Sequence, residues 1–530
     1  MPTFLDIAMS SSNRRDFIKI LIGGTGASFL TLGASSCGKI NNDHNLKDIT
    51  GHNHQTILKR QRFALAHEYI RGNAYSSSQK VAKVVKCEVL IIGAGASGLV
   101  SAMTLQDNGI HAIMVENESR PGGAGVKGIK DGVHYPYGSV YFVNYDEEIK
   151  EICTKAGVKP IDAPEDAVFY QGNLIENIWN DTVIDSLKIS HQEKEGLKRF
   201  KEFVLNENNI PIYPLQKKLS ARDSALDAQT GREFLLQFKS TFLESLINLY
   251  SKSSLGAGID DVNAFCLLNF YGSELGKEFG LNRYTFPGGM NELYQGMANY
   301  LHPKNQMYNH LIFSIKNTHD GISALCIDEN LEIIEFQAKY ALMSGQKHIA
   351  SHIVQSLPNE QKSAMQAMKY PPYCTIHVKS SKELFPNHIM DVWTMDTNTQ
   401  CTDIICSNAM KRDNSPAQSY IYSIYGSMSH TNRNILLDDS ALATHALKLV
   451  DSTSDYLNNQ MMDSISEIEV FAWGHALAIP FPGSHNGIAQ TASKQFGNII
   501  FSASDNDAAS SFENAFYYGL HSAENIIKYL

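Results

Sequence analysis

The sequence predicts an α/β fold organised around a parallel sheet, and three observations support this prediction. Residues 89–92 are four consecutive aliphatic side chains, as expected of a strand that is covered on both faces. They lead directly into the glycine-rich turn Gly93-Ala94-Gly95-Ala96-Ser97-Gly98, and the helical segment that follows stops at Asn108-Gly109. A second apolar run at 111–115 ends in Glu116. Strand, turn, helix and strand in this order form a βαβ unit.

The glycine-rich turn has the spacing of a dinucleotide-binding loop. Gly93 allows a tight turn, Gly95 lets the backbone approach a pyrophosphate, and Gly98 allows close packing of helix on strand. Ala96 and Ser97 begin the helix, so its free N–H groups and positive dipole end face the phosphates. Glu116 stands eighteen residues after Gly98, near the spacing at which a carboxylate binds an adenosine ribose, and Asn117 follows it.

A second glycine-rich turn favours FAD over NAD. Arg120-Pro121-Gly122-Gly123-Ala124-Gly125 comes directly after Glu116, where flavoenzymes bring main chain alongside their cofactor. An acid at position 116 disfavours NADP, because it would repel a 2′-phosphate. For these glycines considered alone, a plain surface loop remains the alternative.

These segments resemble a known family. Val89–Gly98, Glu116 and Arg120–Gly123 are similar to the N-terminal FAD signature of the flavin-containing amine oxidase superfamily, which also holds phytoene desaturases and protoporphyrinogen oxidases. Phe286-Pro287-Gly288-Gly289-Met290 resembles the segment where such chains re-enter the FAD domain, and the resemblance implies an adenine contact from the backbone at Leu311 or Ile312.

The C-terminal segment extends the resemblance. Residues 497–505 read as a buried strand ending in Asp505, and a helix follows with Glu513-Asn514-Ala515 in its first turn. The resemblance implies Asp505 at the ribityl side of the flavin and Glu513, Asn514 and Ala515 near its pyrimidine edge. The branch it is most similar to contains spermidine dehydrogenases, although a tyrosine usual in amine-oxidase cages is replaced near Ser511.

The resemblance implies two discontinuous domains. A Rossmann-like FAD-binding domain is expected from residues 87–147, 281–346 and 490–530. An α+β substrate domain is expected from 148–280, which is mostly helical in pattern, and 347–489.

Two residues of an irregular loop are candidates for catalysis. Trp473 could form an aromatic wall for a flat or cationic substrate, and His475 could transfer a proton. Their alternatives are a core tryptophan and a hydrogen-bonded histidine. Many amine oxidases carry a lysine near flavin N5 where this chain has Cys374 or Thr375, which favours a dehydrogenase over an oxidase.

The N-terminus resembles an export signal. Ser12-Asn13-Arg14-Arg15-Asp16-Phe17-Ile18-Lys19 is similar to a twin-arginine signal, which implies the twin-arginine translocase as a partner and a periplasmic or envelope location. The apolar run 20–32 is short for a membrane anchor, which is the alternative. Residues 32–38 resemble a lipoprotein cleavage site with Cys37 as the acylated residue, and ordinary cleavage is the other possibility. Residues 38–86 are expected to be a linker with a short helix at Ile57–His67.

Composition excludes several classes of partner. The 530 residues carry a net charge of −10 and no basic stripe, which argues against nucleic acid and against an anionic membrane surface. A lipid on Cys37 would then be the membrane attachment. The cysteines are scattered without a C-x-x-C pattern, so no metal site is expected, although the pair Cys401 and Cys406 leaves metal binding or oxidation as the alternative to a structural role.

We therefore expect an exported FAD-dependent oxidoreductase of the amine oxidase or amine dehydrogenase type. It would move a hydride from a small substrate, with a polyamine as one candidate, to flavin N5, and pass electrons to an unidentified acceptor. The alternatives are a desaturase or isomerase of an apolar substrate, and a non-enzymatic electron-transfer flavoprotein.

Overall fold

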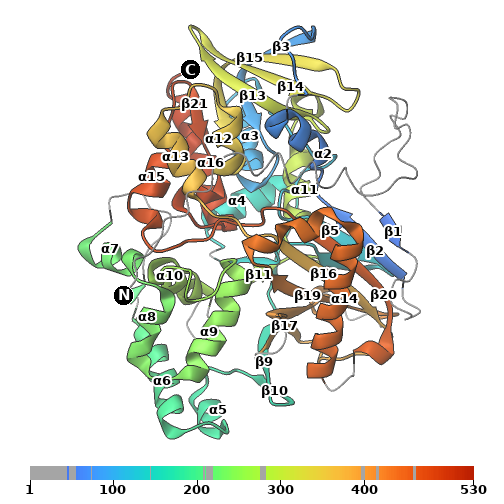
Figure 1. Cartoon of the computed structure of the whole chain (residues 1–530), viewed down its shortest axis with the longest axis vertical. Helices are drawn as coiled ribbons and strands as arrows, with labels where there is room; N and C mark the ends of the chain where they lie inside the picture. Colours follow the sequence, from blue (N-terminus) through green and yellow to red (C-terminus); the bar gives the residue numbers. More distant parts are fainter. Residues whose placement is uncertain are drawn as a thin grey trace, which may run out of the picture. The chain divides into compact units, whose positions relative to one another are not determined.

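The described chain is organised around two large sheets in the computed structural model (Figure 1). The structure describes residues 44–46, 55–72, 74–143, 145–206, 209–210, 219–274, 282–395, 400–413, 417–457 and 461–530. All of them belong to one unit, residues 42–530. The predicted twin-arginine segment and Cys37 lie outside the described residues.

The first sheet contains the predicted βαβ unit. Strand β3 (Val81–Ile92) leads through helix α3 (Ala96–Asp107) to β4 (Ala112–Val115). The parallel neighbours run in the order β12 (Gln306–Met307), β4, β3, β15 (Ile333–Met343) and β21 (Ile499–Phe501). The edge of β15 that meets β21 at Ala341–Met343 also pairs, at Ile333–Ala338, with the antiparallel β14 (Gly321–Ile327), and β14 pairs with β13 (Leu311–Thr318). The α/β prediction is confirmed, and β3 begins six residues inside the expected linker.

Helices cover both faces of this sheet. Helix α3 packs with α4 (Glu147–Ala156), α11 (Asn291–Tyr300) and α16 (Phe512–Ile527) around one apolar core. The opposite face packs against α12 (Lys347–Ile353), α13 (Asn359–Ala367) and α15 (Gln490–Ala492). Residues from three separate stretches of sequence therefore build one layered structure.

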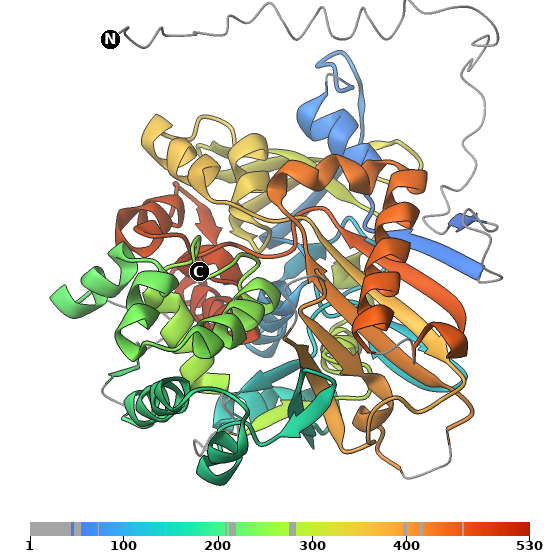
Figure 2. The same cartoon turned by 60° about the horizontal axis from the view of Figure 1, so that its bottom comes forward.

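The second sheet has nine strands in one path. Their order is β1 (His44–Leu46), β2 (Gln55–Arg60), β20 (Ile465–Trp473), β16 (Tyr373–Ser380), β19 (Tyr420–Ser427), β18 (Asp403–Cys406), β17 (Ile389–Thr394), β9 (Glu165–Tyr170) and β10 (Asn173–Glu176). Helix α14 (Asp439–Tyr456) covers the outer face (Figure 2). The inner face is the opposite one, which carries Tyr373, Thr375 and His377 of β16.

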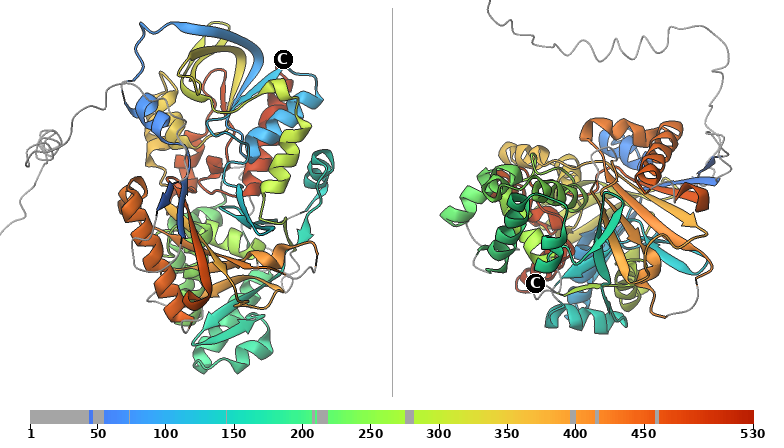
Figure 3. Two further views of the ribbon diagram at one scale, coloured as in Figure 1. Left: turned by 90° about the vertical axis from the view of Figure 1, so that its right-hand side faces the viewer. Right: turned by 90° about the horizontal axis from the view of Figure 1, so that it is seen from below.

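A helical layer covers part of the inner face (Figure 3). It consists of α5 (Asp181–Ser186), α6 (His191–Leu205), α7 (Ala221–Ala228), α8 (Gly231–Leu235), α9 (Thr241–Ser254) and α10 (Ala264–Glu274). Val168 of β9 and Trp393 of β17 join its apolar core. Near β16 and β20 the same face packs instead on the hairpin β5 (Lys127–Lys130) and β6 (Val133–Pro136), through Tyr135 and Tyr137.

The short helix expected at Ile57–His67 is wrong. Residues 55–60 form strand β2, which pairs in parallel with β20, and helix begins only at Ala64, continuing as the π-helical turn η1 (His67–Arg71). Thr56 and Leu58 are buried while Gln55 is exposed. This alternation is that of a half-buried strand, and its partner lies four hundred residues away in the chain, so the local pattern did not reveal it.

Candidate cofactor and active site

The two glycine-rich turns lie back to back. Gly93 has φ +108° and its N–H donates to the Val115 carbonyl at 2.8 Å, while the Gly122 N–H donates to the Ala94 carbonyl at 2.9 Å. A Cβ added to Gly123 would lie 3.1 Å from the Gly95 Cα. A Cβ on Gly98 would overlap the Gly93 carbonyl oxygen. Backbone therefore lines this corner at the C-terminal ends of β3 and β4, where open α/β sheets bind dinucleotides.

Glu116 stands at the end of β4, beside the first turn. Its carboxylate accepts hydrogen bonds from the Ala94 N–H at 2.7 Å and the Glu118 N–H at 2.8 Å. Burial raises the pKa of Glu116, against the effect of these hydrogen bonds. The neighbouring Asn117 donates to the Arg62 carbonyl at 2.9 Å, so the segment after β2 covers this point. Arg120 and Ala124, also predicted to contact the cofactor, are exposed.

The segment around Ile312 reaches the same corner. The His310 N–H donates to the Glu116 carbonyl at 2.9 Å, and Ile312 follows two residues later in β13, almost fully buried. The structure thus brings the predicted adenine-side segment beside the predicted ribose-binding acid.

The C-terminal segment packs against the helix that starts at the glycine turn. The hydroxyl oxygens of Ser97 and Ser502 lie 3.0 Å apart, and the Ser101 hydroxyl donates to the Gly519 carbonyl at 2.9 Å. Asp505 follows Ser502 by three residues and is completely buried. It accepts hydrogen bonds from Lys347 Nζ at 2.8 Å, from the Lys347 N–H at 2.8 Å and from the Tyr370 hydroxyl at 2.6 Å.

The start of α16 holds the remaining predicted cofactor residues. Glu513 accepts the Val143 N–H at 2.8 Å, and burial raises its pKa. Asn514 donates from its side-chain amide to the Ala509 carbonyl at 3.2 Å, and Ala515 is buried. Two buried oxygens, Asn514 Oδ1 and Ser344 Oγ, have no hydrogen-bond partner within the described chain.

These features fit a dinucleotide with a polar ring system. At the corner formed by Gly95 and Gly123, a ligand can approach the backbone directly, because neither glycine has a side chain. Because buried polar atoms are nearly always hydrogen-bonded, the lone oxygens of Ser344 and Asn514 are suited to meet a bound polar group. FAD, which the sequence predicted, has both the pyrophosphate and the polar ring that such a site requires.

The inner face of the nine-stranded sheet gathers acidic and aromatic residues. Cross-strand partners lie on one face of a sheet, and the pairs Thr375–Tyr425, Tyr425–Asp403 and Asp403–Trp393 form one row across it. Asp391 pairs with Asp166 in the next row of the same face. Trp473 of β20 pairs with Tyr373 of β16 on the same face.

Asp403 and Asp391 are the most buried acids of this group, and each is 2% exposed. Burial, and to a smaller extent repulsion from Asp166, raises the pKa of Asp403 to about 6. Asp166 itself pairs with Arg283 at 2.6 Å, whereas no Lys, Arg or His in the described part of the chain forms an ion pair with Asp403. Burial raises the pKa values of Tyr373 and Tyr425 well above the usual value, and the negative charge of Asp403 is the second cause.

The two predicted catalytic residues, Trp473 and His475, lie in different surroundings. Trp473 is 5% exposed, its ring lies 4.6 Å from that of Phe471, and its indole N–H donates to the Tyr137 carbonyl at 2.8 Å. His475 stacks on His348 at 4.0 Å, and burial lowers its pKa far below the usual value, with help from His348 and nearby arginines. Their roles in catalysis stay predictions, and a neutral His475 would be a weak proton acceptor.

Sequence reasoning missed the acids of the inner face. Asp166, Asp391 and Asp403 come from three strands separated by long stretches of chain, so no local motif joins them. It also missed Lys347, the buried partner of Asp505. Of the two residues considered in place of a lysine, Thr375 is on the inner face and Cys374 packs on the outer face.

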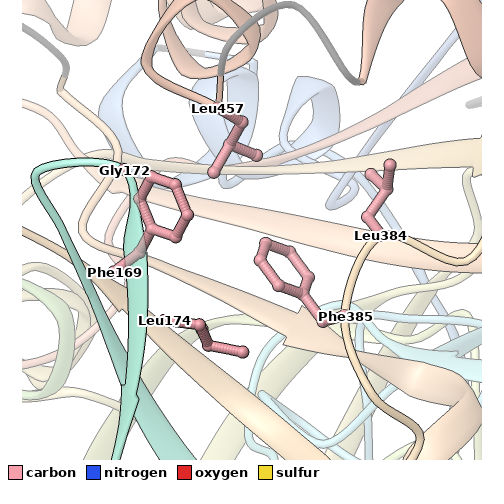
Figure 4. Close-up of a pocket in the computed structure, with 6 residues that line it drawn as sticks. All are labelled: Phe169, Gly172, Leu174, Leu384, Phe385 and Leu457. Atoms are coloured by element: carbon pink, nitrogen blue, oxygen red, sulfur yellow. The ribbon is translucent and has the colours of Figure 1, made fainter.

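An apolar cavity of about 160 Å³ lies on the outer face (Figure 4). Its walls are Phe169, Gly172, Leu174, Leu384, Phe385 and Leu457. Because it lies on the face away from Asp403 and carries no titratable group, it takes no part in the candidate site.

Neither a metal centre nor a membrane span is found in the described residues. No group of three or more His, Cys, Asp and Glu side chains there could hold a metal ion. No helix in the same residues is long and apolar enough to cross a membrane.

The paired glycine turns, the acid after β4 and the C-terminal strand and helix that close on them define a FAD-dependent oxidoreductase. The family model for flavin-containing amine oxidoreductases matches residues 96–527, and the chain belongs to this family. The predicted family, fold class, cofactor and enzyme class are therefore confirmed.

Solved structures of amine oxidases share this fold. Putrescine oxidase bound to putrescine has a TM-score of 0.66 at 17% identity, covering 84% of this chain and 100% of that one. Cyclohexylamine oxidase from Brevibacterium oxydans has a TM-score of 0.64 at 15% identity, covering 84% and 99%. No curated protein matches the sequence of this chain.

Proposed function

We propose that this flavoenzyme oxidises an amine with more than one nitrogen, a diamine or polyamine. The observation that carries the proposal is the buried Asp403, which lies between Tyr425 and Trp393 on the inner face without a cationic partner in the described chain. Asp391 and Asp166 pair with each other in the next row of the same face.

The physical argument concerns charge. A buried carboxylate without a counter-ion is unfavourable, and a bound ammonium group would offset that cost. Aromatic faces add to this attraction, by about 0.5 to 2 kcal/mol for each cation placed over a ring. Tyr425 and Trp393 are the cross-strand partners of Asp403, and Tyr373 lies within range of its charge, so this region suits an organic cation and not an apolar chain.

The roles of the chain's own residues follow from this placement. Gly93, Gly95, Gly98, Gly122 and Gly123 would hold the pyrophosphate against backbone, and Ser344 and Asn514 would bind polar groups of the cofactor. Bound FAD supplies the two-electron acceptor for the substrate. Asp403 would hold the distal ammonium group, while the buried aromatic side chains exclude water and leave the reacting nitrogen unprotonated.

Thr375 bears on the electron acceptor. It occupies the inner face where the resemblance implies a lysine in many amine oxidases, and its hydroxyl donates to the Tyr137 carbonyl at 2.9 Å. We propose that electrons pass to an acceptor other than oxygen, which makes the enzyme a dehydrogenase.

Anaerobic reduction of the bound flavin tests the substrate class. Putrescine and spermidine should bleach the flavin absorbance, and a monoamine should do so only at much higher concentration. Asp403→Asn should raise the diamine concentration needed for half-reduction by about tenfold to a hundredfold, because it removes one charged contact. The monoamine should respond little to this change. Bleaching by an apolar polyene alone would contradict the proposal and favour a desaturase.

The outer-face cavity does not favour the apolar alternative, because its volume of about 160 Å³ is smaller than the roughly 300 to 1,000 Å³ of ordinary ligand pockets. A flavoprotein that retains FAD and is reduced by no small donor would instead be an electron carrier.

We also propose export by the twin-arginine translocase, with attachment to the envelope through a lipid on Cys37. Arg14-Arg15 and the apolar run after them support this proposal. Replacing both arginines by lysine should leave folded, yellow protein in the cytoplasm, as measured by cell fractionation. Cys37→Ala should abolish labelling by a radioactive fatty acid, and unchanged labelling would contradict the lipid attachment.

A further inference from the structure

Six basic side chains lie close enough to influence one another beside the loop that follows Trp473, where turn η1 packs on α12, and we call them the basic cluster. They come from four elements: turn η1, helix α12, the 3-10 helix η7 (His430–Leu437) and the loop after β20. The members are His67, Arg71, His348, His352, Arg433 and His475.

Direct contacts tie the centre of the cluster together. The rings of His348 and His475 are stacked, with centroids 4.0 Å apart and planes inclined by 23°. Arg433 donates from Nε to the Gly474 carbonyl at 3.0 Å and from Nη2 to the Tyr370 carbonyl. Arg433 is therefore held against the loop that carries His475, and within the described residues these contacts go to carbonyl groups and not to a carboxylate.

The positive charge of the cluster is not balanced by the described chain. None of the six side chains forms an ion pair with a carboxylate in the described ranges, although the chain as a whole is acidic. Both ring nitrogens of His348 are shielded from solvent and have no hydrogen-bond partner there. Buried polar groups without partners are rare and unfavourable, so this arrangement is suited to a further ligand.

The protonation of the histidines is consistent with mutual repulsion. Burial, the largest cause, and the charges of Arg71 and Arg433 together lower the pKa of His348 to about 3. Burial lowers the pKa values of His67, His352 and Arg433, and in each case the positive charge of Arg71 is the second cause. Lys362 adds a further positive charge near His352.

We propose that Arg71, Arg433, His348 and His475 form a binding site for a phosphate group, carried by inorganic phosphate or by a small phosphate ester. Guanidinium groups bind phosphate oxygens through paired N–H donors, and imidazole N–H groups add single donors. Arg71 is exposed, so a ligand can reach the site from solvent. The site is distinct from the glycine turns, to which none of the four residues belongs.

Calorimetric titration of the FAD-loaded protein tests this site. Inorganic phosphate and glycerol 3-phosphate are titrated separately at constant ionic strength, which distinguishes free phosphate from esterified phosphate. Saturable binding of either is the expected result. Arg71→Gln should weaken it by about tenfold, because one charge-assisted contact is lost. Arg71 makes no hydrogen bond with the described chain, so this variant should fold normally.

Two further variants complete the test. His348→Phe keeps a ring to stack on His475 and removes the two unpartnered nitrogens, so it should also weaken binding. Arg412→Gln is the matched control, because Arg412 is an exposed arginine paired with Glu292 at 2.6 Å, and it should bind as the unchanged protein does. Absence of saturable binding, equal affinity in all variants, or release of FAD by phosphate would each overturn the proposal.

A spectroscopic readout gives an independent check. Bound phosphate should raise the pKa of His475, because a nearby negative charge favours the imidazolium. Proton NMR of the imidazole signals against pH would show this shift in the unchanged protein and not in Arg71→Gln. An unchanged His475 titration in saturating phosphate would contradict the placement.

Discussion

Lys347 and Asp505 form an ion pair in which neither side chain is exposed to solvent, with 2.8 Å between Nζ and Oδ1. The pair joins the first residue of α12 to the segment after β21, across more than one hundred and fifty residues of sequence. The Tyr370 hydroxyl completes the coordination of Asp505 at 2.6 Å. The acid predicted to meet the ribityl chain is thus also a structural link between two parts of the fold.

Breaking this pair should destabilise the protein strongly. Lys347→Met leaves a buried carboxylate without its counter-ion, and we expect a loss of about 3 to 5 kcal/mol in the free energy of unfolding. The double variant with Asp505→Asn should lose less than the sum of the single changes. Denaturant unfolding of the FAD-loaded protein measures both.

The half-exposed pair Lys155–Asp107, at 2.7 Å, provides the control for this prediction. Lys155→Met should cost about 1 kcal/mol or less, because solvent screens the interaction. Equal losses for Lys347→Met and Lys155→Met would show that the buried pair has no special role.

Gly95 and Gly98 should respond differently to substitution. A Cβ at Gly95 meets only the Gly123 Cα, at 3.8 Å, so Gly95→Ala should leave folding intact and weaken FAD retention. Gly98→Ala should reduce both folding and FAD retention, because the added carbon overlaps the Gly93 carbonyl. Melting temperature and the flavin-to-protein absorbance ratio separate the two effects. Normal flavin content in Gly95→Val would contradict the placement of the pyrophosphate.

The acid Asp403 should make two properties depend on pH. Its pKa of about 6 in the folded protein is above the ordinary value of 3.8, so its ionisation opposes folding. Its contribution to stability is therefore present at low pH and lost as the pH rises toward about 6. Diamine binding should show the opposite trend, since the ionised carboxylate binds the ammonium group.

Comparison with Asp403→Asn tests these trends. The variant should lose less stability than the unchanged protein between about pH 4 and about pH 7. Its diamine affinity should not improve through pH 6 as that of the unchanged protein does. Parallel pH profiles for the two proteins would show that Asp403 does not meet the substrate.

The pair Lys59–Glu469 should stabilise the edge of the nine-stranded sheet. Their charged atoms are 3.1 Å apart, and Tyr135 and Tyr137 also donate to Glu469, at 2.8 and 2.6 Å. Burial alone would raise the pKa of Glu469, but His377, Tyr137 and Lys59 together lower it. The stability that comes from this acid is therefore present above its ordinary pKa and lost as the pH falls through the lowered value.

Lys59→Met should reduce the free energy of unfolding by about 2 kcal/mol at neutral pH, because it removes the ion-pair partner of the buried Glu469. Thermal unfolding over a range of pH measures this change. Glu469→Gln should flatten the acid side of the stability profile. An unchanged profile would mean that other carboxylates cause the loss of stability in acid.

The fold could be predicted from the sequence where elements that are neighbours in the chain also contact one another. The run from Val89 to Glu116 contains its own strand, turn, helix and acid, and the structure has each of them in place. Strand β2 could not be predicted, because what makes residues 55–60 a strand is the edge of β20. Asp403 and Lys347 were missed for the same reason, because their roles depend on contacts with strands and helices that are distant in the sequence.

The pairing of β2 with β20 also limits how the chain can be matured. A protease that removes the beginning of the chain must cut before Gln55 to leave β2 whole, because a cut within or after this strand would remove part or all of it and expose the hydrogen-bonding edge of β20. A bare edge of that length invites pairing between molecules. Over-trimmed protein should therefore collect as aggregates, while correctly trimmed protein stays in solution.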